Sequence, residues 1–103
     1  MEFAAEVLMD GLTRIDVLIR EATRRAGQGF DPDFERQLDA CLRSLRPMLG
    51  ADDTTVAEDA IEAAKRVMTA ADPAAPLLML AMAHKTLNGV LRRQARNQRL
   101  RAA

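Results

Sequence analysis

Five arginines lie close together near the end of the chain and are the residues best suited to bind a charged partner. They are Arg92, Arg93, Arg96, Arg99 and Arg101, and no acidic residue occurs from position 74 to position 103. Lys85 brings this segment to a formal charge of +6, whereas residues 1–73 carry nine basic and fifteen acidic side chains, a formal −6. The net charge of zero therefore conceals a dipolar molecule, whose field steers encounters with charged partners.

The basic C-terminal end, residues 92–103, admits three interpretations. If the last helix packs antiparallel on the first, we expect these ion pairs: Arg101 and Arg99 with Glu2, Arg96 with Glu6, and Arg92 or Arg93 with Asp10. Such pairing, within the chain or in a dimer, is the favoured interpretation, and an acidic protein partner is the second. Nucleic acid or an anionic membrane comes third, because no aromatic residue lies nearby to stack on bases and no nucleic-acid-binding signature occurs.

The single histidine, His84, lies between Leu80 and Leu87 on an apolar seam. This setting predicts a partly buried ring that is held by a hydrogen bond, and a pH-sensitive interface is the next interpretation. Metal binding is disfavoured, because no second histidine or cysteine stands at ligand spacing. The sequence therefore predicts no metal.

The single cysteine, Cys41, lies between Leu38 and Leu42 and is expected to pack in the core, because a reactive thiol needs a basic, partly exposed setting. One cysteine excludes an intrachain disulfide and fits a reducing compartment. The acids Asp52 and Asp53 are interpreted as a solvated turn and helix cap. No glycine-rich phosphate loop, nucleophile elbow or metalloprotease motif occurs, so the sequence predicts neither an enzyme nor a cofactor.

An apolar segment opens the last predicted helix and is apolar on nearly all sides. A helix with this pattern is buried either in its own core or against a partner. The residues expected to contact a partner are Leu77, Leu78, Met79, Leu80, Met82 and His84. The apolar run of residues 74–83 is interrupted by Pro76 and is far shorter than the ~20 residues that span a bilayer.

Four helices must position these residues. They are expected over residues 2–26, 32–46, 55–71 and 77–101. Gly27 suits the end of the first helix, Asp31 is a good N-cap for the second, and Pro47 ends it. Thr55 and Glu58 have the spacing of a capping box at the start of the third helix.

Each predicted helix carries an apolar stripe for the core. The stripes are Leu8, Leu12, Ile15, Ile19, Ala22 and Ala26, widened by Val7 and Leu18; Phe34, Leu38, Cys41, Leu42 and Leu45; Ala57, Ala60, Ile61, Ala64, Val67, Met68 and Ala71; and Leu77, Leu80, His84, Leu87 and Leu91. At 1.5 Å per residue the first and last helices are ~14 Å longer than the middle pair. A second copy or another protein is expected to cover the excess.

These features predict a single all-α domain over residues 1–103, a small bundle or array of three to four helices. Acidic residues interrupt any secretory signal near the N-terminus, so the expected compartment is the cytoplasm. The composition and the long end helices are typical of small chaperones and regulatory adaptors. We therefore expect a non-enzymatic protein-interaction module that covers a partner helix or self-associates. A nucleic-acid-associated regulator that uses the arginine-rich end is the alternative.

Overall fold

A computed structural model describes the backbone of residues 2–102 and the side chains of residues 5–101. The helices are α1 (Glu2–Arg24), α2 (Pro32–Leu45), α3 (Ala51–Thr69) and α4 (Ala74–Ala102), with a short 3-10 turn, η1 (Arg46–Met48), after α2. No β-strand occurs in this part of the chain. The predicted all-α bundle is therefore confirmed.

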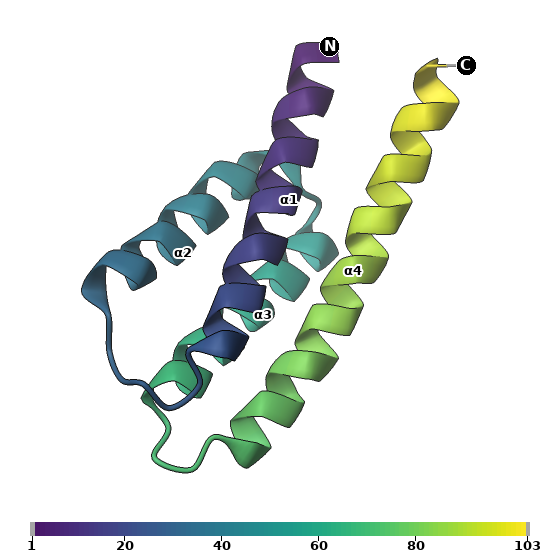
Figure 1. Cartoon of the computed structure of the whole chain (residues 1–103). Helices are drawn as coiled ribbons and strands as arrows, with labels where there is room; N and C mark the ends of the chain where they lie inside the picture. Colours follow the sequence, from purple (N-terminus) through teal and green to yellow (C-terminus); the bar gives the residue numbers. More distant parts are fainter. Residues whose placement is uncertain (1, 103) are drawn as a thin grey trace.

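The two long helices form the frame of the molecule. They run antiparallel, so both chain ends lie at the same end of the fold, while α2 and α4 lie on opposite sides of α1 (Figure 1). The fold measures 48 × 24 × 22 Å. From their residue counts, α1 and α4 are about 34 and 43 Å long, against about 21 and 28 Å for α2 and α3. Both long helices extend past the short pair at the end that holds the termini (Figure 1).

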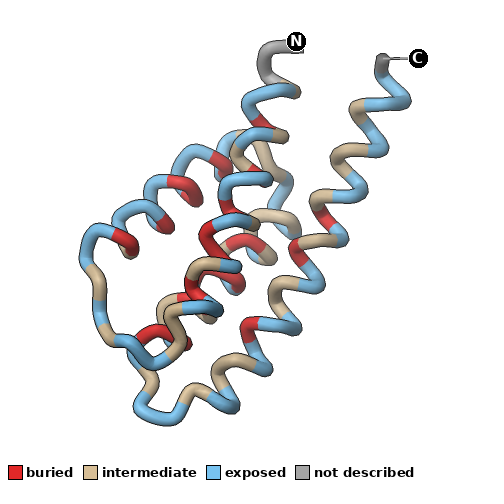
Figure 2. Tube along the Cα trace, viewed as in Figure 1, coloured by how far each residue is buried: buried red, intermediate tan, exposed pale blue. Residues whose placement is uncertain are grey.

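The core lies where the four helices meet (Figure 2). Its largest fully buried side chains are Leu12, Ile15, Ile19, Leu38, Leu45, Met68, Leu80, Leu87 and Val67. The predicted stripe of α2 is buried throughout. Two predicted core residues are exposed: Val7 lies at the edge of its stripe, and Ala71 lies beyond the end of α3. In α4, Val90 is buried although it lies outside the predicted stripe.

A glycine brings α1 and α2 close together. A Cβ placed on Gly11 would lie 2.7 Å from Cδ2 of Leu45, a side chain that is completely buried. A glycine inside a helix is unfavourable on propensity alone. Here the missing side chain makes room for Leu45.

The loop after α1 depends on two further glycines. The helix ends at Arg24, two residues before the predicted end, and Gly27 and Gly29 have φ of +74° and +109°. Their N–H groups donate to the carbonyl oxygens of Val67 and Met68, at 2.9 and 2.8 Å. Glycine adopts this left-handed backbone without steric cost, so the loop is fastened to the end of α3.

The start of α2 follows the prediction. Oδ1 of Asp31 accepts hydrogen bonds from the N–H groups of Asp33 (3.0 Å) and Phe34 (3.2 Å), and Pro32 occupies the first helical position. The ring of Phe34 also lies under the guanidinium of Arg25, 4.9 Å from its centre. These contacts fix the entry into α2.

The predicted capping box of α3 is wrong. The helix begins four residues earlier, at Ala51, with Gly50 as N-cap. The hydroxyl of Thr55 instead donates to the carbonyl of Ala51 at 3.2 Å, as a residue inside the helix does. The physical reason is that Asp52 and Asp53 favour the positive end of the helix dipole and extend the helix backwards.

The last helix also begins earlier than predicted, at Ala74 rather than Leu77. Oδ1 of Asp72 accepts the N–H of Ala74 at 3.2 Å and so starts the helix. Pro76 lies in the first turn, where its missing N–H costs nothing, since the first N–H groups of a helix have no partner within it. The apolar segment is therefore wholly helical.

Candidate functional site

The first half of α4 presents apolar side chains on the face away from the core. Leu78 is 69% exposed, Met79 55% and Met82 71%. Leu78 and Met82 lie one turn apart on the same face. We call these three residues the apolar patch.

The other residues predicted to contact a partner lie on the inner side of α4. Leu80 is buried in the chain's own core, and Leu77 packs against that core. His84 is mostly buried between α4 and α1. The structure therefore presents only half of the predicted contact residues, because the inner side of the apolar segment is filled by α1 and α3.

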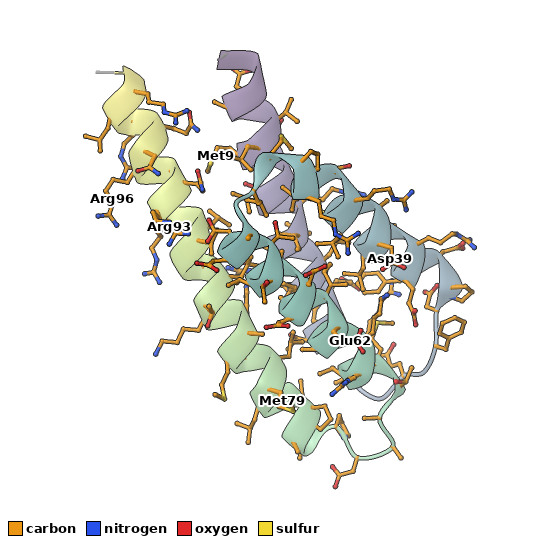
Figure 3. The ribbon with its side chains drawn as sticks, turned by 180° about the vertical axis from the view of Figure 1, so that it is seen from behind. Met9, Asp39, Glu62, Met79, Arg93 and Arg96 are labelled. Atoms are coloured by element: carbon orange, nitrogen blue, oxygen red, sulfur yellow. The ribbon has the colours of Figure 1, made fainter. Side chains whose placement is uncertain are left out.

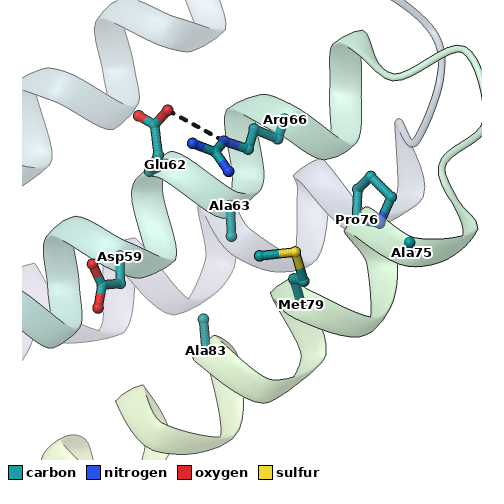
Figure 4. A pocket seen from close by; sticks show the side chains of 8 residues that line it. All are labelled: Asp59, Glu62, Ala63, Arg66, Ala75, Pro76, Met79 and Ala83. Carbon is teal, nitrogen blue, oxygen red and sulfur yellow. Dashed lines mark ion pairs between the residues drawn. The ribbon is translucent and has the colours of Figure 1, made fainter.

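A groove of about 550 Å³ runs between α3 and α4 beside the apolar patch (Figure 4). Its lining residues are Asp59, Glu62, Ala63, Arg66, Ala75, Pro76, Met79 and Ala83. Met79 reaches from α4 toward Ala63 on α3, and alanines form much of the floor. An apolar side chain from a partner helix would find both room and apolar contacts there.

The α3 rim of the groove is charged. Oε1 of Glu62 lies 3.5 Å from Nε of Arg66 (Figure 4), whereas Asp59 makes no ion pair with any described side chain. The rim therefore offers acidic groups to a basic residue that lies across the groove.

The basic half of α4 does not form the ion pairs predicted with α1. Among the described side chains its arginines make one ion pair, between Arg93 and Asp53 of α3. The predicted partners Glu6 and Asp10 are not engaged by α4, and Glu2 lies outside the described side chains. Asp53 is consequently an ion-pair partner rather than part of a solvated turn.

The remaining arginines of the predicted charge patch are exposed. They are Arg92, Arg96, Arg99 and Arg101. Arg96 reaches away from α1 (Figure 3). These groups are sterically accessible to carboxylates or phosphates of a partner.

His84 joins α4 to α1, as a hydrogen-bonded and partly buried residue. Its Nε2 lies 2.5 Å from Oδ1 of Asp16, whose Oδ2 accepts from Nε of Arg20 at 3.0 Å. Both the histidine and the aspartate are mostly shielded from water. The contact orients α4 on α1 and leaves the ring nitrogen facing the carboxylate rather than solvent.

Cys41 is buried, as predicted. Burial raises the pKa of its thiol above the ordinary value, and the positive charge of Arg14 partly opposes this. Its Sγ lies 3.5 Å from the carbonyl oxygen of Gly11. The raised pKa keeps the thiol protonated near neutral pH, which makes it a poor nucleophile.

No group of three or more histidine, cysteine or acidic side chains able to hold a metal ion occurs among the described residues. None of the described helices combines the length and the apolar character that crossing a membrane requires.

The sequence did not single out the α3 side of the groove. Asp59, Glu62 and Ala63 look like an ordinary solvated helix face, and only the position of α4 makes them part of a groove. Gly89 was not predicted to matter either. It lies within α4 with no atom within 4 Å of its Cβ position, and its signal in the sequence is a glycine inside a helix with no evident reason for it.

Comparison with protein-family models, with curated proteins and with solved structures finds no match to this chain.

Proposed function

We propose that this chain is a non-enzymatic protein-interaction module, of the small chaperone, adaptor or regulator type. Its contact surface is the apolar patch together with the adjoining groove. The observation that carries the proposal is the exposure of Leu78, Met79 and Met82, adjacent side chains on a helix whose opposite face is already in the core.

Burial of this patch by a partner supplies the driving force for association. Full burial of a leucine or methionine side chain stabilises a complex by ~1.5–3 kcal/mol, before the costs of association. Two methionines give the patch a flexible, polarisable surface that adapts to different partners. The expected occupant is an amphipathic helix whose apolar side chains, spaced by three or four residues, enter the groove.

The experiment compares Leu78→Ser/Met82→Ser with Val17→Ser, a control that removes an exposed apolar side chain from α1 (57% exposed). Sedimentation velocity of the labelled chain, alone and in cell extract, measures association, and circular dichroism checks folding. We expect the double variant to lose association while the control keeps it. A folded wild-type chain that stays monomeric in both conditions, or complexes that the double variant leaves intact, would refute the proposal.

A nucleic-acid-associated regulator is the second candidate, and one observation favours it. Arg92, Arg96, Arg99 and Arg101 make no ion pair with any described carboxylate, so they are available to phosphates. Affinity for an oligonucleotide would then fall steeply with salt, because each phosphate contact releases counterions. Association through the apolar patch would survive ~0.5 M salt, at which exposed charges are screened within a few ångströms.

A further inference from the structure

The exposed face of α4 contains a glycine that nothing in the chain explains. A Cβ on Gly89 would meet no atom within 4 Å, whereas a Cβ on Gly11 would collide with Leu45. Glycine lowers helix propensity, and it is favoured where another backbone approaches closely. Within the described part of the chain, no backbone approaches Gly89.

Apolar side chains flank Gly89 symmetrically. Leu78 and Leu100 each lie eleven residues from it, which is about three helical turns, so all three residues share one face. Both leucines are 69% exposed. A two-fold axis through Gly89 would therefore bring Leu78 of one α4 to the level of Leu100 on a second, antiparallel α4.

The acidic residues Asp59 and Glu62 on the α3 rim of the groove are opposite in charge to the basic half of α4, and Glu62 also lies 3.5 Å from Arg66 on the same rim. The helices α3 and α4 run antiparallel, because Arg93 of α4 pairs with Asp53 of α3 while Ala83 and Ala63 line the same groove. Glu62, the neighbour of Ala63, therefore lies beside the turn of α4 that includes Ala83. On α4, Arg96 lies seven residues after Gly89 and Met82 seven before it. A second, antiparallel α4 thus brings its Arg96 to the level of Met82, within reach of Glu62.

We infer that α4 is the interface of a symmetric homodimer, in which two α4 helices cross antiparallel at Gly89. A shallow crossing of about 20°, common between packed helices, lays the C-terminal half of each α4 along the α3–α4 groove of the other copy. Leu100 then fills the apolar part of the groove beside Met79, and Arg96 faces Glu62. The inference rests on the proposed function and names a second copy of the chain as the partner.

The surface has about the size that a specific dimer needs. From Leu78 to Leu100 it is roughly 33 Å long, and it is roughly 20 Å wide, two helix diameters, only as far as α3 runs beside α4. The resulting footprint, roughly 600 Å² per copy, lies at the low end of the roughly 600–1,000 Å² per partner of specific interfaces. Lys85 is level with Arg93 of the second copy, and the Asp53 carboxylate that binds Arg93 lowers this repulsion.

The first test is a charge exchange, measured by sedimentation equilibrium of the purified chain at about 50 mM salt. Arg96→Glu and Glu62→Arg are each expected to raise the dimer dissociation constant about tenfold or more, and the double variant to restore it to within about threefold of wild type. Circular dichroism confirms that each variant is folded. Failure of the double variant to restore the dimer would overturn the assigned pairing.

The second test reports the axis directly. Gly89→Cys, with Cys41→Ala to remove the other thiol, is expected to form an interchain disulfide under mild oxidation, because a residue on the axis meets its own copy within the about 7 Å that a disulfide tolerates. Asn97→Cys in the same background is the matched control. It lies eight residues from the axis, so its two copies would be about 24 Å apart and stay reduced. Equal crosslinking at both positions would overturn the geometry.

The outcomes separate this inference from the proposed function. A purified chain that is monomeric at 200 µM, while its complexes in extract remain sensitive to Leu78→Ser/Met82→Ser, would refute the homodimer and support a different protein partner. A folded chain that associates in neither setting would refute both.

Discussion

Replacing Gly11 by alanine tests the closest helix contact in the fold. On propensity alone Gly→Ala inside a helix stabilises by ~1 kcal/mol. At Gly11 the new Cβ would lie 2.7 Å from Cδ2 of Leu45, a completely buried side chain that cannot swing into solvent. Overpacking of this kind costs ~1–3 kcal/mol, so Gly11→Ala should be neutral to destabilising, by up to ~2 kcal/mol.

Gly89→Ala is the matched control, because the same substitution there meets no atom within 4 Å. In the monomer it should stabilise the fold by ~0.5–1 kcal/mol. The free energies of unfolding of the two variants should therefore differ by ~1–3 kcal/mol. In a domain of this size each kcal/mol shifts Tm by ~4–8 °C. Urea unfolding followed by circular dichroism, at a protein concentration low enough for the monomer, measures the difference.

A double variant isolates the contact itself. Leu45→Val removes the atom that collides with the new methyl group and should cost less in the Gly11→Ala background than in the wild type. If Gly11→Ala stabilises the protein as much as Gly89→Ala does, α1 and α2 are not packed this closely. Gly11 would then not be needed to make room for Leu45.

Three further outcomes follow from the packing. Leu87→Ala, at a completely buried site, should cost ~2–5 kcal/mol in urea unfolding, whereas Leu78→Ala on the exposed face should change stability by less than ~0.5 kcal/mol. Asp16→Ala should cost ~1–2 kcal/mol, because it leaves the His84 ring without its partner, and a double-mutant cycle with His84→Ala should show positive coupling. The raised pKa of the Cys41 thiol means that the folded state favours the neutral form. The stabilisation from the neutral thiol is thus complete below the ordinary thiol pKa of 9.0 and is lost as pH rises from there through the higher pKa of the folded state, so the stability difference between wild type and Cys41→Ala should be constant at neutral pH and change above pH 9.0.

Periodicity and capping residues were enough to predict most of the fold. The stripe from Phe34 to Leu45 is buried as expected, since α2 begins at an unambiguous Asp-Pro signal and packs on one side only. The errors occur where two local signals compete. Thr55 resembles an N-cap, but Gly50 followed by two aspartates in the first turn provides an earlier start.

The candidate site was predictable in part. The apolar character of residues 77–83 indicated a contact surface, and the spacing of Leu77, Leu80 and His84 predicted the side that packs in the core, but the same three residues were also expected to contact a partner. The division of the segment between core and solvent depends on which neighbours occupy each side of α4, so Leu80 packs inside while Leu78 is exposed. The ion pairs of the arginines likewise depend on the rotation of α4, which turns Arg93 toward Asp53 of α3 rather than toward α1.

The two ends of α4 depend on different interactions. The part up to Val90 has Leu80, Leu87 and Val90 in the core, whereas no described residue of α4 after Val90 is buried. The part beyond Val90 continues a helix that is already formed and so bears no nucleation cost, but most helical stability in proteins comes from tertiary packing, and this part has no fully buried residue among those described. The favourable position of Arg99 and Arg101 at the negative end of the helix dipole adds only ~0.3–1 kcal/mol each. Within the chain, the tertiary contacts of this segment include the packing of Leu91 on the core and the ion pair of Arg93 with Asp53. If the proposed second copy covers the rest, association should stabilise the helical form of the basic half of α4.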